Sequence, residues 1–95
     1  MAYGVSAEVR RFAGNPTTTE VTDADITEAV ARADALINSS LGKTWVAADT
    51  EYNAIVQASN LWAASQVLDN FSDSENKAEK LRAEFWSIIN GLIAR

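Results

Sequence analysis

The sequence predicts an all-α protein, a compact bundle of three long helices with a short N-terminal helix laid across it. Two segments repeat apolar residues at the three- and four-residue intervals of an amphipathic helix. Between them, residues 52–68 carry no charge and are apolar around most of the helical circumference, which indicates a buried central helix. A chain of 95 residues has the length of one domain, which we expect to span residues 1–95.

A short helix is predicted over about residues 6–13. Ser6 is placed to cap its N-terminus, and Gly14 is placed to end it. Val9 and Phe12 share one face of this helix. We therefore expect the short helix to cover the end of the bundle with these two side chains.

The first long helix is predicted over about residues 23–41. Thr22 and Asp25 have the spacing of a capping box at its start, and Gly42 supplies the left-handed residue that ends helices. Its apolar side comprises Ile26, Ala29, Val30, Ala33, Ile37, Ser40 and Leu41. Its polar side comprises Thr27, Glu28, Arg32, Asp34 and Asn38, which we expect to face solvent.

The central helix is predicted over about residues 50–70. Asn53, Gln57 and Asn60 fall on one narrow polar stripe, and apolar residues occupy most of the remaining surface. A membrane span is the alternative interpretation of this uncharged segment. Its amide and hydroxyl side chains make it too polar for the hydrocarbon core of a bilayer, so a soluble bundle is favoured.

The last helix is predicted over about residues 73–94, and Ser72 with Glu75 forms a second capping-box pattern at its start. One apolar stripe of this helix comprises Ala78, Leu81, Phe85, Ile88, Ile89, Leu92 and Ile93. Trp86 lies on the border of the stripe, where it either widens the core or faces a neighbouring molecule.

The chain contains neither cysteine nor histidine, which excludes disulfides, thiolate nucleophiles, histidine acid–base catalysis and the usual zinc sites. Two acidic pairs, Asp23 with Asp25 and Asp73 with Glu75, have the composition of a metal or acid–base site. Both pairs lie at predicted helix starts, where capping and the helix dipole explain them. We therefore predict no enzyme and no catalytic, cofactor-binding or metal-binding residues.

The net charge of −5, from 13 acidic and 8 basic side chains, argues against binding to nucleic acid or to anionic lipid. A helix-turn-helix across residues 26–68 is a formal alternative, but its recognition helix would be the uncharged segment, which is poorly suited to a groove lined with phosphates. The N-terminus has no long apolar run after its basic pair, so we expect no secretory signal.

These exclusions leave a protein that works by contacting other proteins. The candidate interface residues are Trp45, Trp86, Leu92, Ile93, Arg95, Arg10 and Arg11. Trp45 has two interpretations, because it could plug the end of the bundle or stand at the surface as an anchor. Trp86, Leu92, Ile93 and Arg95 could likewise simply complete the core. For Arg10 and Arg11, the alternative is two solvated side chains with no role in an interface.

The order of these signals resembles the small head–tail connector, or adaptor, proteins of tailed viruses of bacteria and archaea. The resemblance runs from SAEVRRFAG through a threonine-rich loop to TDADITEAVARADALINSSLGKTW, an alanine-rich buried helix and a final amphipathic helix. Its most specific part matches Asp23, Ile26, Ala29, Val30, Ala33, Asp34, Ile37, Leu41 and Gly42. The match is a pattern of apolar and capping residues, and it contains no catalytic signature.

The resemblance implies a structural virion protein that forms a homo-oligomeric, dodecameric ring beneath the portal protein. Such a ring extends the DNA channel, docks the stopper or tail protein, and lets DNA pass through its lumen without specific binding. It implies a location in the virion neck, between capsid and tail, after assembly in the host cytoplasm. The alternative is a non-viral helical interaction or regulatory module.

Overall fold

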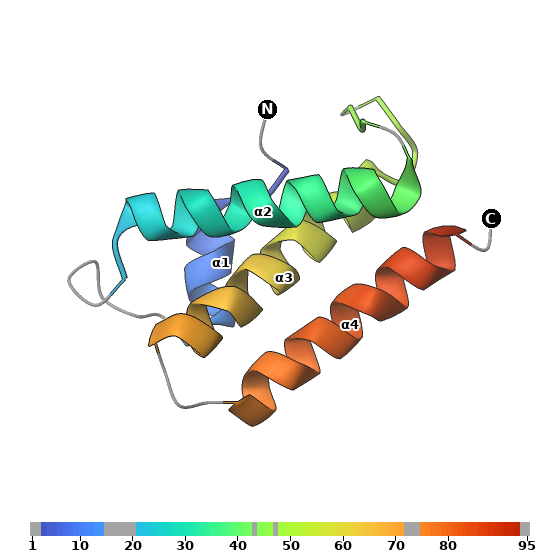
Figure 1. Ribbon diagram of the computed structural model, residues 1–95. Coiled ribbons are helices and arrows are strands. Elements are labelled where there is room, and N and C mark those ends of the chain that lie inside the picture. The colour runs from blue at the N-terminus through green and yellow to red at the C-terminus, as the bar shows by residue number, and fades with distance from the viewer. Residues whose placement is uncertain (1–2, 15–20, 43, 47, 72–74, 94–95) are drawn as a thin grey trace.

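The computed structural model describes residues 3–14, 21–42, 44–46, 48–71 and 75–93, and these form four helices (Figure 1). The helices are α1 (Ser6–Phe12), α2 (Asp23–Leu41), α3 (Tyr52–Phe71) and α4 (Glu75–Ile93). They confirm the predicted all-α bundle of three long helices and a short N-terminal one. The predicted threonine-rich loop and the Ser72 cap lie outside the described residues.

Helix α3 is the centre of the bundle, because α1, α2 and α4 all pack against it. In Figure 1, α4 runs antiparallel to α3, and α1 is partly hidden behind α2 and α3. The radius of gyration is 12.7 Å, close to the value of about 12–13 Å for a compact domain of this length. No described helix is both long and apolar enough to cross a bilayer.

The ends of α2 are fixed by the residues that the sequence predicts. The Asp25 backbone N–H donates to Thr22 Oγ1 at 3.2 Å, and the Thr22 N–H donates to Asp25 Oδ2 at 3.0 Å, which completes the capping box. Gly42 ends the helix with a φ of +69°, and its N–H donates to the Asn38 carbonyl. Both predictions for the limits of this helix are confirmed.

Replacement of Thr22 by alanine is expected to lower the free energy of unfolding by about 1 kcal/mol, because it removes the acceptor for the Asp25 N–H. Urea denaturation followed by circular dichroism measures this change. Thr27→Ala is the matched control, since Thr27 lies inside α2 and its hydroxyl only donates to the Asp23 carbonyl. Equal losses in the two variants would contradict the capping role.

The start of α1 differs from the prediction. Val5, not Ser6, is the N-cap residue, and no side chain caps this end. Ser6 is already helical, because the Val5 carbonyl accepts the first helical hydrogen bond from the Val9 N–H. Gly14 follows the helix with a φ of +87°, in agreement with its predicted role.

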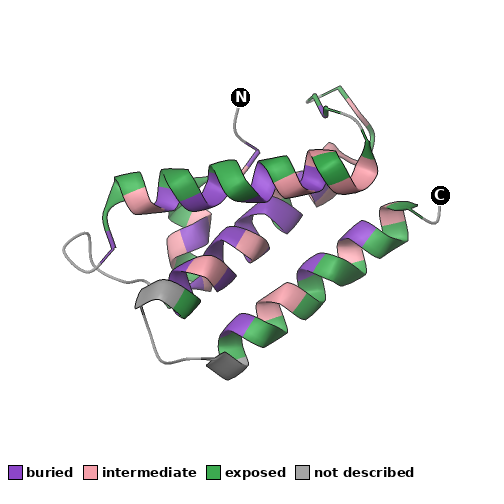
Figure 2. Cartoon of the chain, viewed as in Figure 1, coloured by how far each residue is buried: buried purple, intermediate pink, exposed green. Residues whose placement is uncertain are grey.

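The core forms two adjoining clusters of buried side chains, and α3 contributes to both. The first joins α1, α2, α3 and the start of α4. The second joins Tyr3, α2, the α2–α3 loop, α3 and the second half of α4. Phe12, Trp62 and Leu81 pack against both clusters. Figure 2 shows the result on α4, where buried residues repeat along one side and exposed residues cover the other.

Candidate protein interface

The outer surface of α4 exposes two large apolar side chains. Trp86 is 40% exposed and Ile93 is 57% exposed. They are seven positions apart, so they lie about 10 Å apart along the helix axis and on nearly the same side of it. We call this pair the α4 ridge. The position of Trp86 beside the buried stripe agrees with its predicted border position, whereas Ile93, which was predicted on the stripe itself, is exposed.

The core holds Trp86 in place from one side. The Phe85 ring lies fully buried beneath α4, and its centroid is 4.9 Å from that of Trp86, with the rings at 79° to each other. This edge-to-face geometry is favourable for aromatic pairs and restricts the indole. An exposed aromatic side chain that is already fixed loses little rotamer entropy when a partner covers it.

Other candidates at this end of the chain are divided between the core and the surface. Leu92 is half-buried and packs against the second core cluster, so only part of its surface is open to a partner. Arg95 lies outside the described residues. The α4 ridge is therefore the part of the predicted C-terminal interface that the structure places at the surface.

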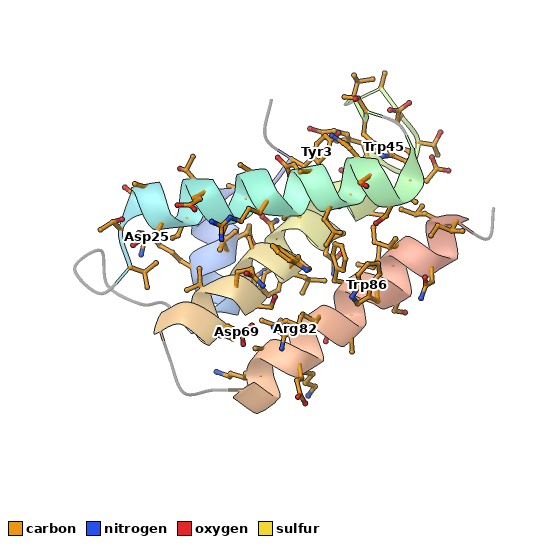
Figure 3. The ribbon with its side chains drawn as sticks, in the orientation of Figure 1. Tyr3, Asp25, Trp45, Asp69, Arg82 and Trp86 are labelled. Atoms are coloured by element: carbon orange, nitrogen blue, oxygen red, sulfur yellow. The ribbon has the colours of Figure 1, made fainter. Side chains whose placement is uncertain are left out.

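Trp45 lies in the interior of the bundle, so the prediction that it is an exposed interface anchor is wrong. Its side chain is only 9% exposed and packs in the second core cluster. Its backbone N–H donates to Tyr3 Oη at 2.9 Å, and Figure 3 shows the two residues together near the end of α2. The structure therefore matches the bundle-plug interpretation, because Tyr3 and Trp45 close the same end of the core.

The two adjacent arginines of α1 are both engaged within the molecule. Arg10 Nη2 donates to the Val21 carbonyl and to Asp23 Oδ1, each at 2.8 Å, and so ties α1 to the start of α2. Arg11 donates to Glu8 through Nε at 3.0 Å and Nη2 at 2.5 Å. Each positive charge has an acidic neighbour, which reduces the attraction of this pair for phosphate.

A buried polar cluster that the sequence did not predict lies between α2 and α3. Asp34 accepts hydrogen bonds from the Tyr3 backbone N–H at 3.1 Å and from the Ser59 hydroxyl at 2.7 Å. Asn60 Oδ1 accepts from the Val5 N–H at 2.7 Å, and the Tyr3 hydroxyl donates to Asn38 Oδ1 at 2.6 Å. These bonds fasten the extended segment of residues 3–5 across the two helices.

This cluster overturns the expectation that Asp34 faces solvent, and it explains the burial of a polar residue on the stripe of α3. Asp34 and Asn60 are both buried, although each falls among polar residues of its own helix. The physical reason is the same for both, because the N-terminal segment covers them and its backbone N–H groups satisfy their oxygens. The helical pattern alone contains no signal for a cover that comes from a distant part of the chain.

Burial raises the pKa of the Asp34 carboxyl, and the hydrogen bonds from Ser59 and from the Tyr3 backbone oppose that rise. The folded protein therefore binds a proton at Asp34 more tightly than the unfolded chain does. The contribution of this group to the free energy of unfolding is largest below the pKa of the unfolded chain and falls as pH rises through the folded pKa.

Asp34→Asn is expected to remove this pH dependence. The free energy of unfolding of the wild type, relative to that of the variant, should rise as pH falls from neutral toward about 4, where an ordinary aspartate is half-protonated. Denaturant titrations at a series of pH values measure the difference. A difference that stays constant with pH, or that shrinks on acidification, would contradict the raised pKa.

Within the described ranges, no three acidic side chains gather as a metal site would require. Surface features available to a partner include the α4 ridge, the exposed side chains of Val5 and Val46, and shallow grooves beside α1 and α2. Comparisons of the chain with protein-family models, with curated proteins and with solved structures find no match.

Proposed function

We propose that this protein is a structural adaptor subunit of a virus particle, of the head–tail connector kind. The observation that carries the proposal is the α4 ridge, in which an exposed tryptophan and an exposed isoleucine share one side of a helix, directly beside the stripe that packs in the core. Exposed aromatic anchors of this type are typical of protein interfaces. The resemblance of the helix and loop order to connector proteins indicates the kind of assembly, which is a ring of subunits beneath the portal.

A closed ring needs a heterologous contact, in which one surface of a subunit fits a different surface of the next. The α4 ridge supplies the protruding surface of such a contact, either with the next copy or with the portal protein. The charge distribution fits a channel that DNA traverses. The chain has a net charge of −5, and the only adjacent basic pair, Arg10 and Arg11, is engaged with acidic side chains.

Native mass spectrometry of the protein, alone and mixed with the portal protein of the same genome, tests this proposal. A stoichiometric assembly of many copies on the portal, twelve if the family's ring is dodecameric, is the expected result. A chain that remains monomeric and ignores the portal would contradict the proposal and favour the non-viral interaction module.

Trp86→Ser and Ile93→Ser, each made separately, are expected to weaken that assembly by about thirtyfold or more, because each removes an apolar anchor from the ridge. Lys80→Ser is the matched control, since Lys80 is exposed on α4 away from the ridge. Thermal melts separate loss of assembly from loss of folding. If both ridge variants assemble as the control does, the ridge is not the contact surface.

A further inference from the structure

The α4 ridge lies on a part of its helix that carries no charged side chain. Residues 85–93 contain neither an acidic nor a basic residue, although more than half of them are exposed. The exposed members are Trp86, Ser87, Asn90, Gly91 and Ile93. The centre of a protein interface is depleted of charge and enriched in aromatic side chains. This half of α4 therefore has the composition of a surface that a partner covers.

A groove of about 450 Å³ lies beside α2, next to the N-terminal segment. We call it the α2 groove, and its principal lining residues are Gly4, Thr27, Ala31, Asp34, Ala35 and Asn38. From Thr27 to Asn38 the groove follows about 16 Å of helix, since each residue advances by about 1.5 Å. Ala31 and Ala35 are exposed and end in a single methyl group, so a second helix can approach the backbone of α2 closely.

The α2 groove is largely apolar, and its single ionisable lining residue is a buried carboxyl group. Glu28 and Arg32 are exposed on α2, but they pair with each other outside the described lining of the groove. Asp34 is 9% exposed, and each of its oxygens accepts one hydrogen bond from within the fold. A carboxylate offers about four acceptor positions, so acceptor capacity remains. An apolar groove with an acceptor suits an indole, whose N–H needs a partner when it is covered.

A single molecule does not bring the ridge and the groove together. Helices α2 and α4 both pack against α3 and lie on opposite sides of it in Figure 1. Two copies can bring them together, because Trp86 and Ile93 lie about 10 Å apart along their helix and the groove is about 16 Å long. We propose that the α4 ridge of one copy docks in the α2 groove of the next copy.

This contact is heterologous, because each copy offers its ridge to one neighbour and its groove to the other. A closed ring requires a contact of this type. The inference rests on the ring assembly proposed above, and it specifies the subunit interface of that ring. An interface anchored by two side chains falls at the small end of the range, below about 1,200 Å². Two free copies should therefore separate readily, and a covalent trap is the suitable test.

The sequence contains no cysteine, so disulfide trapping can be applied to the full-length protein. Asn90→Cys places a thiol on α4, between the two ridge residues along the helix. Ala31→Cys and Ala35→Cys each place a thiol in the α2 groove. All three positions are exposed, which favours retention of the fold, and thermal melts under reducing conditions verify it.

Equal amounts of Asn90→Cys and one groove variant are mixed and oxidised, with and without the portal protein, and the products are separated by non-reducing electrophoresis. Ser39→Cys replaces the groove variant in the control mixture, since Ser39 is exposed on α2 outside the groove. A disulfide needs Cβ atoms about 3.5–4.5 Å apart, so the yield of mixed dimer should exceed that of the control by about tenfold with at least one groove variant. A chain that carries Asn90→Cys and that groove substitution together should give a ladder of linked copies.

Three results would overturn the inference. Efficient dimers of Asn90→Cys alone would show that ridge pairs with ridge, and a yield equal to that of the Ser39→Cys control would show that the groove is not the partner surface. A many-copy assembly on the portal without the mixed disulfide would overturn this interface and leave the adaptor function standing. Conversely, the mixed disulfide in a protein that ignores the portal would support the interface and contradict the adaptor function.

Discussion

Replacing Phe85 with alanine is expected to lower the free energy of unfolding by about 3–5 kcal/mol. The ring is fully buried, and it lies between the indole of Trp62 from α3 at 6.4 Å and that of Trp86 at 4.9 Å. Its removal leaves a cavity where α4 packs on the central helix, and it also removes the support of Trp86. The lost stability has two parts, the transfer free energy of the buried ring atoms that are deleted and the cost of the cavity they leave.

A loss of that size is a large fraction of the 5–15 kcal/mol that stabilises a typical domain. The variant should therefore melt at a much lower temperature and unfold at a much lower urea concentration, which circular dichroism measures directly. Ser87→Ala is the control on the same helix, since Ser87 is exposed. If Phe85→Ala costs less than about 1 kcal/mol, the packing of α4 on α3 described above is wrong.

Gly4→Ala is expected to destabilise the fold by about 1–3 kcal/mol, because the site has no space for a methyl group. A Cβ at this position would lie 2.9 Å from Ser59 Oγ and 3.0 Å from a methyl carbon of Val30. The flanking residues are fixed by the bonds from the Tyr3 and Val5 N–H groups to Asp34 and Asn60. The segment can therefore accommodate the methyl group only by moving away from the helices.

The matched control for Gly4→Ala is the same substitution at Gly91. This residue lies near the end of α4, and a Cβ there would meet nothing within 4 Å. Alanine is the better helix former, so Gly91→Ala should stabilise the protein by up to about 1 kcal/mol. Opposite signs in chemical denaturation are the expected result, and a stabilising or neutral effect of Gly4→Ala would contradict close docking of the N-terminal segment.

The sequence predicted those parts of the structure that depend on neighbours along the chain. Thr22 and Asp25 are three residues apart, and the capping box between them is present. The absence of charge in residues 52–68 correctly indicated a buried helix. Each of these signals depends on helical spacing, which is a local property of the backbone.

The parts that the sequence missed depend on contacts between distant residues. Asp34 lies 31 positions from Tyr3, and Asn60 lies 55 positions from Val5. Helical periodicity assigns Asp34 to the polar side of its helix and Asn60 to a polar stripe, and only the path of the N-terminal segment explains why both are buried. For the same reason, the pattern placed Trp86 on a border and left two interpretations for Trp45, which the exposed fractions of the two side chains now separate.

The way in which the N-terminal segment is attached has a consequence for the order of folding. Its bonds reach Asp34, Asn60 and the backbone of Trp45, which come from two helices and the loop between them. Those acceptors and donors are not assembled until α2 and α3 have met, so the segment can dock only as a late step. Because its contacts are absent before that step, they slow the unfolding of the finished domain more than they speed its formation.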